Sequence, residues 1–316
     1  MNSSLHYLFF VLALSLSSDC YCAEAVISVY VIAGQSNAEG QGELSHLRAL
    51  VDSPLTAETY SHLVDQNGDW AVLDNVYCRY NENERIGKLT AGFGFRTHKI
   101  GPELEFGHII GNATDDTVLI IKTTWGGASL AADFRPPSSG DPIYDYEILG
   151  DDGTSVSAEG LTYGHRYRQM INLITDSLAN INQIIPDYDG SGWKLNGFVW
   201  FQGFSDVIDT RKLTEYATNL IYLVQDVRND LSVPDLPFVI GELGMQGPVA
   251  NADHQTMRTI QRGVTEFSGF RTLMAFAETS TAVVMDVQDG FNFDGPGHFH
   301  YDGRADTFLD IGASFA

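Results

Sequence analysis

Five short runs of β-branched and aromatic residues alternate with segments whose apolar residues recur at helical spacing, and this alternation limits the folds open to the chain. The strand-like runs cover residues 25–34, 116–127, 195–203, 236–244 and 272–279. The helical patterns cover residues 101–113, 167–185, 213–231 and 303–316. Runs that are apolar almost throughout are typical of strands buried on both faces of a parallel sheet. The order therefore predicts a doubly wound α/β fold, with helices on both faces of a central parallel sheet.

Two stretches, 43–100 and 128–165, are irregular and rich in Gly, Asp and Pro. We expect them to form long loops at the strand ends, where substrate pockets often form. No linker-like segment divides the chain, so we predict a single domain over residues 26–316.

The N-terminus resembles an export signal. Residues 5–18 form an apolar run that is too short to span a membrane comfortably, and small residues with a plausible cleavage site follow it. We predict a signal peptide over residues 1–25 and a secreted or periplasmic protein. Removing that segment takes Cys20 and Cys22 with it, so Cys78 has no disulfide partner and is expected to be a small buried hydrophobe.

The net charge of the chain limits the classes of partner that we expect it to bind. The chain has 18 Lys and Arg against 41 Asp and Glu, a net charge of −23. Such a surface repels nucleic acid and anionic membranes, and we expect neither as a partner. It also disfavours a polyanionic substrate slightly, unless a local basic pocket at Lys122, Arg135 and Arg166 offsets it.

Polar residues follow three of the predicted strands. The first strand ends in Gly-Gln-Ser-Asn with Ser36, the second in Trp-Gly-Gly with Gly126 and Gly127, and the third in a block that contains Gln202. Two histidines, His298 and His300, precede the last helical pattern. The carboxyl ends of parallel strands lie at one edge of a sheet, so these groups should be neighbours.

This set of residues fits serine-based acyl transfer. A serine hydroxyl becomes a good nucleophile when a base such as histidine takes its proton. The oxyanion that forms needs preorganised donors, usually backbone N–H groups beside glycine and a side-chain amide. The common G-x-S-x-G elbow of α/β-hydrolases is absent, because Ser36 lies in Gly-Gln-Ser-Asn-Ala.

The blocks GQSN, IKTTWGG, VWFQGFSD and HFHYDG, in this order, resemble those of the SGNH hydrolases, and among these the sialate O-acetylesterase-like carbohydrate esterases. The resemblance runs from about residue 26 to residue 316. It implies a flavodoxin-like three-layer α/β/α sandwich with no metal and no other cofactor.

The same resemblance assigns roles to residues. Ser36 would be the nucleophile, and its N–H would join the oxyanion hole. Gly126 or Gly127, together with Gln202, would complete that hole, and a C-terminal histidine would be the base. We expect the flanking residues Gln35, Asn37 and Trp125 to contact the substrate, although a tryptophan such as Trp125 is more often a core residue than a platform for a sugar.

The chain also departs from these relatives. Phe204 stands where many of them have an acidic residue. Many have Asp three residues before the histidine, whereas Asp294 precedes His298 and His300 at other offsets. The triad acid is therefore open, and a Ser-His dyad oriented by a backbone carbonyl is an alternative. We favour His300 over His298 as the base, because its spacing from the last helix matches relatives.

The leading hypothesis is an exported serine esterase that removes O-acetyl groups from a carbohydrate. A lipase or thioesterase of the same superfamily is a second hypothesis. A third is a catalytically inactive carbohydrate-binding protein on the same scaffold, which the missing Asp-x-x-His pattern would explain.

Overall fold

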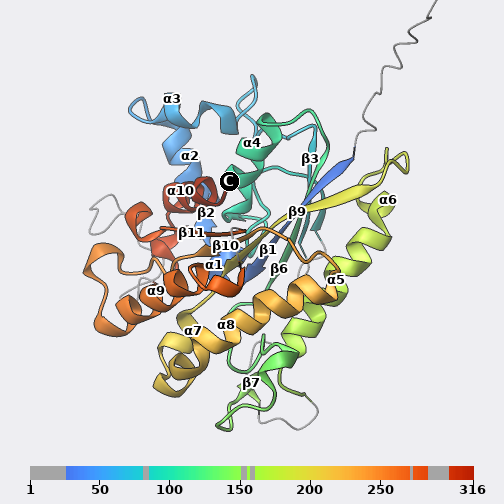
Figure 1. Cartoon of the computed structure of the whole chain (residues 1–316). Coiled ribbons are helices and arrows are strands. Elements are labelled where there is room, and N and C mark those ends of the chain that lie inside the picture. The colour runs from blue at the N-terminus through green and yellow to red at the C-terminus, as the bar shows by residue number, and fades with distance from the viewer. Residues whose placement is uncertain (1–25, 81–84, 151–154, 157–160, 271–272, 284–298) are drawn as a thin grey trace, which may run out of the picture.

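The computed structural model describes residues 26–80, 85–150, 155–156, 161–270, 273–283 and 299–316 (Figure 1). The predicted signal peptide, Asp294 and His298 therefore lie outside the described residues.

A seven-stranded sheet forms the centre of the described chain, in the order β11-β10-β9-β1-β6-β3-β4. Its strands are β1 (Ile27–Gly34), β3 (Val76–Tyr80), β4 (Arg85–Lys88), β6 (Val118–Thr124), β9 (Trp193–Phe201), β10 (Phe238–Gly241) and β11 (Met274–Ala277). Neighbouring strands are parallel, except that β4 pairs antiparallel with β3 at one edge. Two small antiparallel pairs lie apart from this sheet: β2 (Gly42–Glu43) with β5 (Lys99–Ile100), and β7 (Ile148–Leu149) with β8 (Ser155–Val156).

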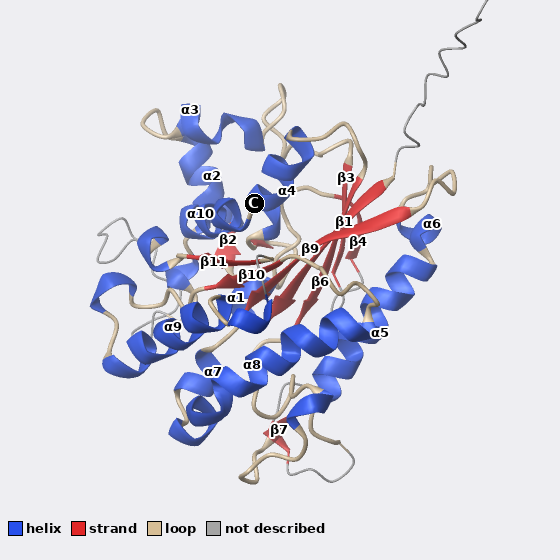
Figure 2. Cartoon of the chain, in the orientation of Figure 1, coloured by secondary structure: helices blue, strands red, loops and turns tan. Residues whose placement is uncertain are grey.

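Helices cover both faces of the sheet, which gives the three layers of an α/β/α sandwich (Figure 2). One layer holds α2 (Leu44–Asp52), α4 (Glu103–Asn112) and α10 (Ala305–Phe315). The other holds α5 (His165–Ala179), α8 (Thr210–Asp230) and α9 (Ala252–Thr265). The short helices are α1 (Ser36–Glu39), α3 (Ala57–Tyr60), α6 (Ile181–Ile184) and α7 (Phe204–Val207). The predicted three-layer, flavodoxin-like architecture is confirmed.

The core lies between the sheet and both helix layers. All seven residues of β6 are buried, as expected for a central strand covered on both faces. Phe198 of β9 stacks on Phe238 of β10 with ring centroids 4.5 Å apart, and Trp200 is fully buried. Cys78 is buried within β3, as predicted.

The topology places β1 at a switch point. The chain leaves β1 towards β3, returns to β6 on one side of β1, and then crosses to β9 on the other side. The carboxyl end of β1 thus opens into the crevice where ligands bind in open α/β sheets. Gly34 ends this strand at φ +148°, and a Cβ there would lie 2.0 Å from the Phe201 carbonyl oxygen, so only glycine fits.

The expectation of one long loop over 43–100 is wrong in part. That stretch contains β3 and β4 of the central sheet as well as α2 and α3. The five strands and four helical segments predicted from the sequence are confirmed, with ends shifted by a few residues, whereas α9 was not predicted.

Candidate active site

Three strand ends meet beside Ser36. β1 pairs with β6 on one side and with β9 on the other, in register to Gly34. The Trp125 N–H donates to the Gly34 carbonyl at 3.0 Å, and the Gln35 N–H donates to the Phe201 carbonyl at 3.3 Å. The predicted meeting of Ser36, the glycine pair and Gln202 at one edge of the sheet is therefore confirmed, while their chemical roles stay predictions.

Ser36 is the first residue of α1 and is partly exposed. The residues on both sides of it, Gln35 and Asn37, are buried. The hydroxyl-bearing residue is thus held by a rigid frame and still reachable from outside.

Asn37 joins the nucleophile region to the C-terminal loop. Its Nδ2 donates to the Phe299 carbonyl oxygen at 3.3 Å, across 262 positions of sequence. Its Oδ1 is buried and has no partner within the described part of the chain. His300 follows Phe299 directly and is partly exposed. The choice between His300 and His298 as base remains open, because His298 lies outside the described residues.

Gln35 holds the loop after β9. Its Oε1 accepts from Gln202 Nε2, from the Gly203 N–H and from the Ser205 N–H, each at 3.2 Å. The Gln35 side chain is buried, and its carbonyl oxygen is occupied by these three protein donors. Contact of Gln35 with substrate therefore stays a prediction that this geometry does not favour.

Glu39 is a buried acid that the sequence did not reveal as part of the site. It lies three residues after Ser36 and is 1% exposed. The Gly126 N–H donates to its Oε1 at 2.6 Å, and Lys122 Nζ donates to its carbonyl oxygen at 2.7 Å. Glu39 thus joins α1 to the loop after β6. Its place one helical turn from Ser36 was the only available signal, and an acidic residue in so polar a segment suggests a surface position.

The two glycines differ in the hydrogen bonding of their backbone N–H groups. The Gly126 N–H is engaged by Glu39, whereas neither the Gly127 N–H nor the Ser36 N–H has a hydrogen-bond acceptor among the described residues. Gly127 has φ +79°, a backbone conformation that glycine adopts readily. Neither N–H group is thus used by the described part of the protein, and their roles as oxyanion donors stay predictions.

Gln202 lies in a buried polar network. Its Nε2 donates to Asp206 Oδ2 at 2.6 Å and has the Ala128 carbonyl at 3.1 Å and Gln35 Oε1 at 3.2 Å. Its Oε1 is buried without a partner in the residues that the structure describes. The amide nitrogen is thus surrounded by protein acceptors, and its predicted role as an oxyanion donor remains untested.

Asp206 fixes the loop after β6. Its carboxylate accepts from the Leu130 N–H at 2.8 Å and from the Ala131 N–H at 2.9 Å, in addition to Gln202. Burial raises the pKa of Asp206 to about 6, although these donors act in the opposite direction. The sequence contained this residue in the third block but did not indicate its role.

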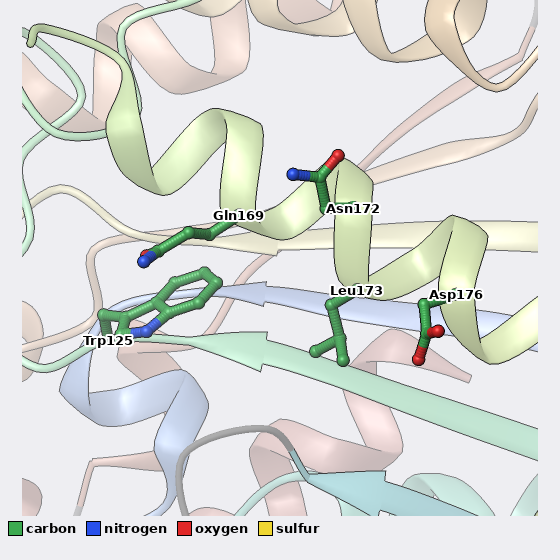
Figure 3. Close-up of a pocket in the computed structure, with 5 residues that line it drawn as sticks. All are labelled: Trp125, Gln169, Asn172, Leu173 and Asp176. Carbon is green, nitrogen blue, oxygen red and sulfur yellow. The ribbon is translucent and has the colours of Figure 1, made fainter.

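Trp125 is mainly a core residue. It is 2% exposed, its ring centroid lies 5.7 Å from that of Phe134, and the Arg166 guanidinium lies 5.3 Å from its ring. The indole borders a pocket of about 300 Å³ along α5 (Figure 3). The pocket is lined by Trp125, Gln169, Asn172, Leu173 and Asp176. Substrate contact by Trp125 stays a prediction.

The suggested basic pocket does not exist. Lys122 pairs with Glu103 at 2.8 Å, and Arg135 pairs with Glu215 at 2.9 Å, both in buried positions. Arg166 donates to the Gly150 carbonyl at 2.9 Å and packs on Trp125. These cations are buried against protein partners, so they do not offset the acidic surface for a polyanionic substrate.

Metal ligands and membrane-spanning helices bear on the predicted cofactors and partners. Within the described ranges, no three His, Cys, Asp or Glu side chains are grouped so that they could hold a metal ion. In the same part of the chain, no helix has the length and apolar character needed to cross a membrane.

Solved structures show where this fold occurs. A structure of an Arabidopsis thaliana protein aligns with a TM-score of 0.53 at 14% identity, covering 92% of this chain and 99% of that one. A carbohydrate acetylesterase from Xanthomonas citri gives 0.53 at 14% identity, over 91% of this chain and 55% of the other. NanS gives 0.50 at 14% identity, over 80% and 77%. At such low identity the likeness concerns the fold.

Sequence comparison identifies the family. A probable carbohydrate esterase of Arabidopsis thaliana is 35% identical over 48 residues, which is 15% of this chain and only 18% of that protein. A family model described as carbohydrate esterase, sialic acid-specific acetylesterase, matches residues 26–275. That match covers most of the chain and includes β1, β6 and β9 with the polar residues that follow them. The chain therefore belongs to the sialic acid-specific acetylesterase family of carbohydrate esterases.

Proposed function

We propose that this protein is a serine esterase that removes O-acetyl groups from a carbohydrate, with Ser36 as nucleophile and His300 as base. The observation that carries the proposal is the hydrogen bond from Asn37 Nδ2 to the Phe299 carbonyl. It joins the residue after Ser36 to the residue before His300, which supports a working pair of serine and histidine. Family membership supports the reaction type.

The reaction proceeds in two acyl-transfer steps. Ser36 Oγ attacks the acetyl carbonyl carbon while the His300 ring takes the serine proton. The Ser36 and Gly127 N–H groups stabilise the oxyanion. The intermediate collapses, the sugar oxygen leaves with the proton from His300, and an acetyl-serine remains. Water, deprotonated by His300, then attacks this ester. The bond to Ser36 Oγ breaks, His300 returns the proton to that oxygen, and acetate is released.

Other residues of the site position these groups. We assign Gln202 and Glu39 to holding the loops after β9 and β6, because Gln202 Nε2 and Glu39 Oε1 contact protein groups. The ring of His300 is oriented either by Asp294 or by a backbone carbonyl.

The proposal also includes the site of action. We infer from the sequence that residues 1–25 are a signal peptide and that residues 26–316 act as one esterase domain outside the cytoplasm. Identification of the mature N-terminus by mass spectrometry tests this, and a mature protein that retains residues 5–18 would contradict it.

The experiment is acetate release from an O-acetylated methyl glycoside by the wild type and by Ser36→Ala. Ser314→Ala is the matched control, because this exposed serine of α10 donates only to the Ile311 carbonyl. We expect Ser36→Ala to lose activity by several orders of magnitude and Ser314→Ala to keep it. His300→Ala should cost nearly as much as Ser36→Ala, and His298→Ala far less.

Several results would contradict the proposal. More than a few per cent of wild-type activity in Ser36→Ala would exclude Ser36 as the nucleophile. The reverse ranking of the histidine variants would identify His298 as the base. Faster cleavage of long-chain esters than of acetates would favour a lipase or thioesterase. A folded wild type with no activity on p-nitrophenyl acetate would favour an inactive binding protein.

A further inference from the structure

Phe299 carries an exposed aromatic ring, and its backbone is bound to Asn37, the residue that follows the proposed nucleophile. Its carbonyl accepts from Asn37, so the residue is held close to Ser36. Its side chain is nevertheless 46% exposed. A large apolar ring held open at a reaction centre can gain free energy by packing against whatever binds there.

A second ring continues this surface. Phe204 follows Gln202 and Gly203 at the end of β9, and its ring centroid lies 5.3 Å from that of Phe299 at an interplanar angle of 61°. Phe204 is partly exposed, and its ring also lies 6.3 Å from that of His254. Two phenyl rings from segments far apart in sequence are thus in contact with each other, and one of them belongs to the residue bound to Asn37.

Ile208 extends the surface away from Ser36. Its N–H donates to the Phe204 carbonyl at 3.4 Å, so it lies one helical turn further on the same side of α7. It is 67% exposed. Phe299, Phe204 and Ile208 therefore form an uncharged surface, here called the apolar strip, on a protein with a net charge of −23.

We propose that the apolar strip is a substrate subsite that receives the C–H face of a pyranose ring whose O-acetyl group Ser36 cleaves. This inference rests on the proposed function. A pyranose presents C–H groups on a face and hydroxyls around its rim, so aromatic rings bind the face while the rim stays in water. The strip offers no charge, and hence it selects an uncharged ring face rather than a sulfate or phosphate group.

The test compares two acetyl esters that differ in the sugar. One is an O-acetylated methyl glycoside, and the other is ethyl acetate, which has no ring. In Phe299→Ala, kcat/KM for the glycoside should fall about tenfold more than kcat/KM for ethyl acetate. The difference should appear as a higher KM for the glycoside. A tenfold change corresponds to about 1.4 kcal/mol of binding free energy. Phe299→Tyr, which keeps the ring, should recover most of the loss.

The chain offers a matched control. Phe267 is 38% exposed and packs on Phe270 with ring centroids 5.2 Å apart at 71°, next to the end of α9 and outside the site. Phe267→Ala removes an equivalent exposed ring and should not change the ratio between the two esters.

Each outcome of this comparison either supports or overturns the proposed subsite. An unchanged ratio in Phe299→Ala overturns the subsite, and so does an equal loss on both esters, which would mean that the ring only positions the loop with His300. A loss of activity confined to esters of longer acyl chains would mean that the apolar strip binds the acyl group, and this would also overturn the proposed sugar subsite. If the wild type cleaves neither ester, the proposed function fails separately. Calorimetric binding of the same glycoside to the wild type, Phe299→Ala and Phe267→Ala then tests the subsite, which requires weaker binding in Phe299→Ala alone.

Discussion

At the scale of single residues, the candidate site contains a buried carboxylate, Glu39, three residues after the proposed nucleophile Ser36. The four residues of α1 cannot make a stable helix alone, since isolated helices need about 12–15 residues. Glu39 ties this short helix to Gly126 through its side chain and to Lys122 through its carbonyl. Lys122 is itself held by Glu103. Ser36 is therefore positioned by contacts that come from β6 and α4.

We predict that Glu39→Ala lowers kcat by about 10²-fold, because small displacements of reacting groups have effects of that size. Glu39→Gln should keep most of the activity, since an amide oxygen can still accept from the Gly126 N–H. Steady-state kinetics on an acetylated glycoside, with circular dichroism as a check of folding, measures this. A Gln variant as impaired as the Ala variant would show that the hydrogen bond is not what matters.

The sequence predicted the place of Ser36, the glycine pair and Gln202 because each follows a strand of one parallel sheet. It could not divide the work between Gly126 and Gly127, since that depends on Glu39, a partner 87 positions away. Nor could it show that Gln202 Nε2 is surrounded by three acceptors, of which Gln35 and Ala128 come from other segments and Asp206 from its own.

At the scale of elements, the loops after β6 and β9 are held together by Asp206 of α7. The carboxylate receives two backbone N–H groups from the first loop and the Gln202 amide from the second. These contacts fix the loop that carries Gly127 relative to the end of β9. The protonation state of Asp206 should therefore affect stability.

Burial raises the pKa of Asp206 from 3.8 to about 6 in the folded protein. Below about pH 4 both the folded and the unfolded chain keep this proton, whereas between about pH 4 and 6 only the folded chain does. The contribution of Asp206 to stability is thus present at low pH and is lost as pH rises through about 6, by roughly 3 kcal/mol. Asp206→Asn does not titrate.

Urea unfolding of the wild type and Asp206→Asn at pH 4 and pH 7 checks the sign. Relative to the variant, the wild type should lose stability on going to pH 7. A constant difference, or a relative gain at pH 7, would mean that the three N–H donors outweigh burial and lower the pKa.

Elements with a strong hydrophobic pattern could be predicted from the sequence, whereas elements with a weak pattern could not. β1, β6 and β9 are central and each contains a run of apolar residues, so the pattern indicated buried strands. β3 and β4 were missed because they are short and contain Arg79, Arg85 and Lys88. β4 is the edge strand of the sheet, and β3 lies next to it. Charged side chains are acceptable there because edge strands reach solvent.

At the scale of the whole molecule, charge is the dominant feature. With a net charge of −23, the negatively charged side chains of the compact protein repel one another. Exposed ion pairs such as Lys88–Asp74 and Arg211–Asp209 contribute little in return. Added salt should therefore stabilise the fold by screening repulsion more than it weakens such pairs.

We predict that the Tm rises by a few degrees when sodium chloride is raised from about 0.01 M to 1 M, as the Debye length falls from about 30 Å to about 3 Å. A gain of about 1 kcal/mol corresponds to ~2–4 °C in a domain of similar size. Differential scanning calorimetry at fixed pH measures this. A flat or falling Tm would show that attractive pairs outweigh the repulsion.

Covalent labelling tests the central assignment, Ser36 as the nucleophile, most directly. The folded enzyme is treated with a fluorophosphonate, which reacts with activated serines, and the labelled peptide is identified by mass spectrometry. Our account predicts one label on Ser36, no label in Ser36→Ala, slow labelling in His300→Ala and near-normal labelling in His298→Ala. A label on another serine, or equal labelling of Ser36→Ala and the wild type, would contradict it.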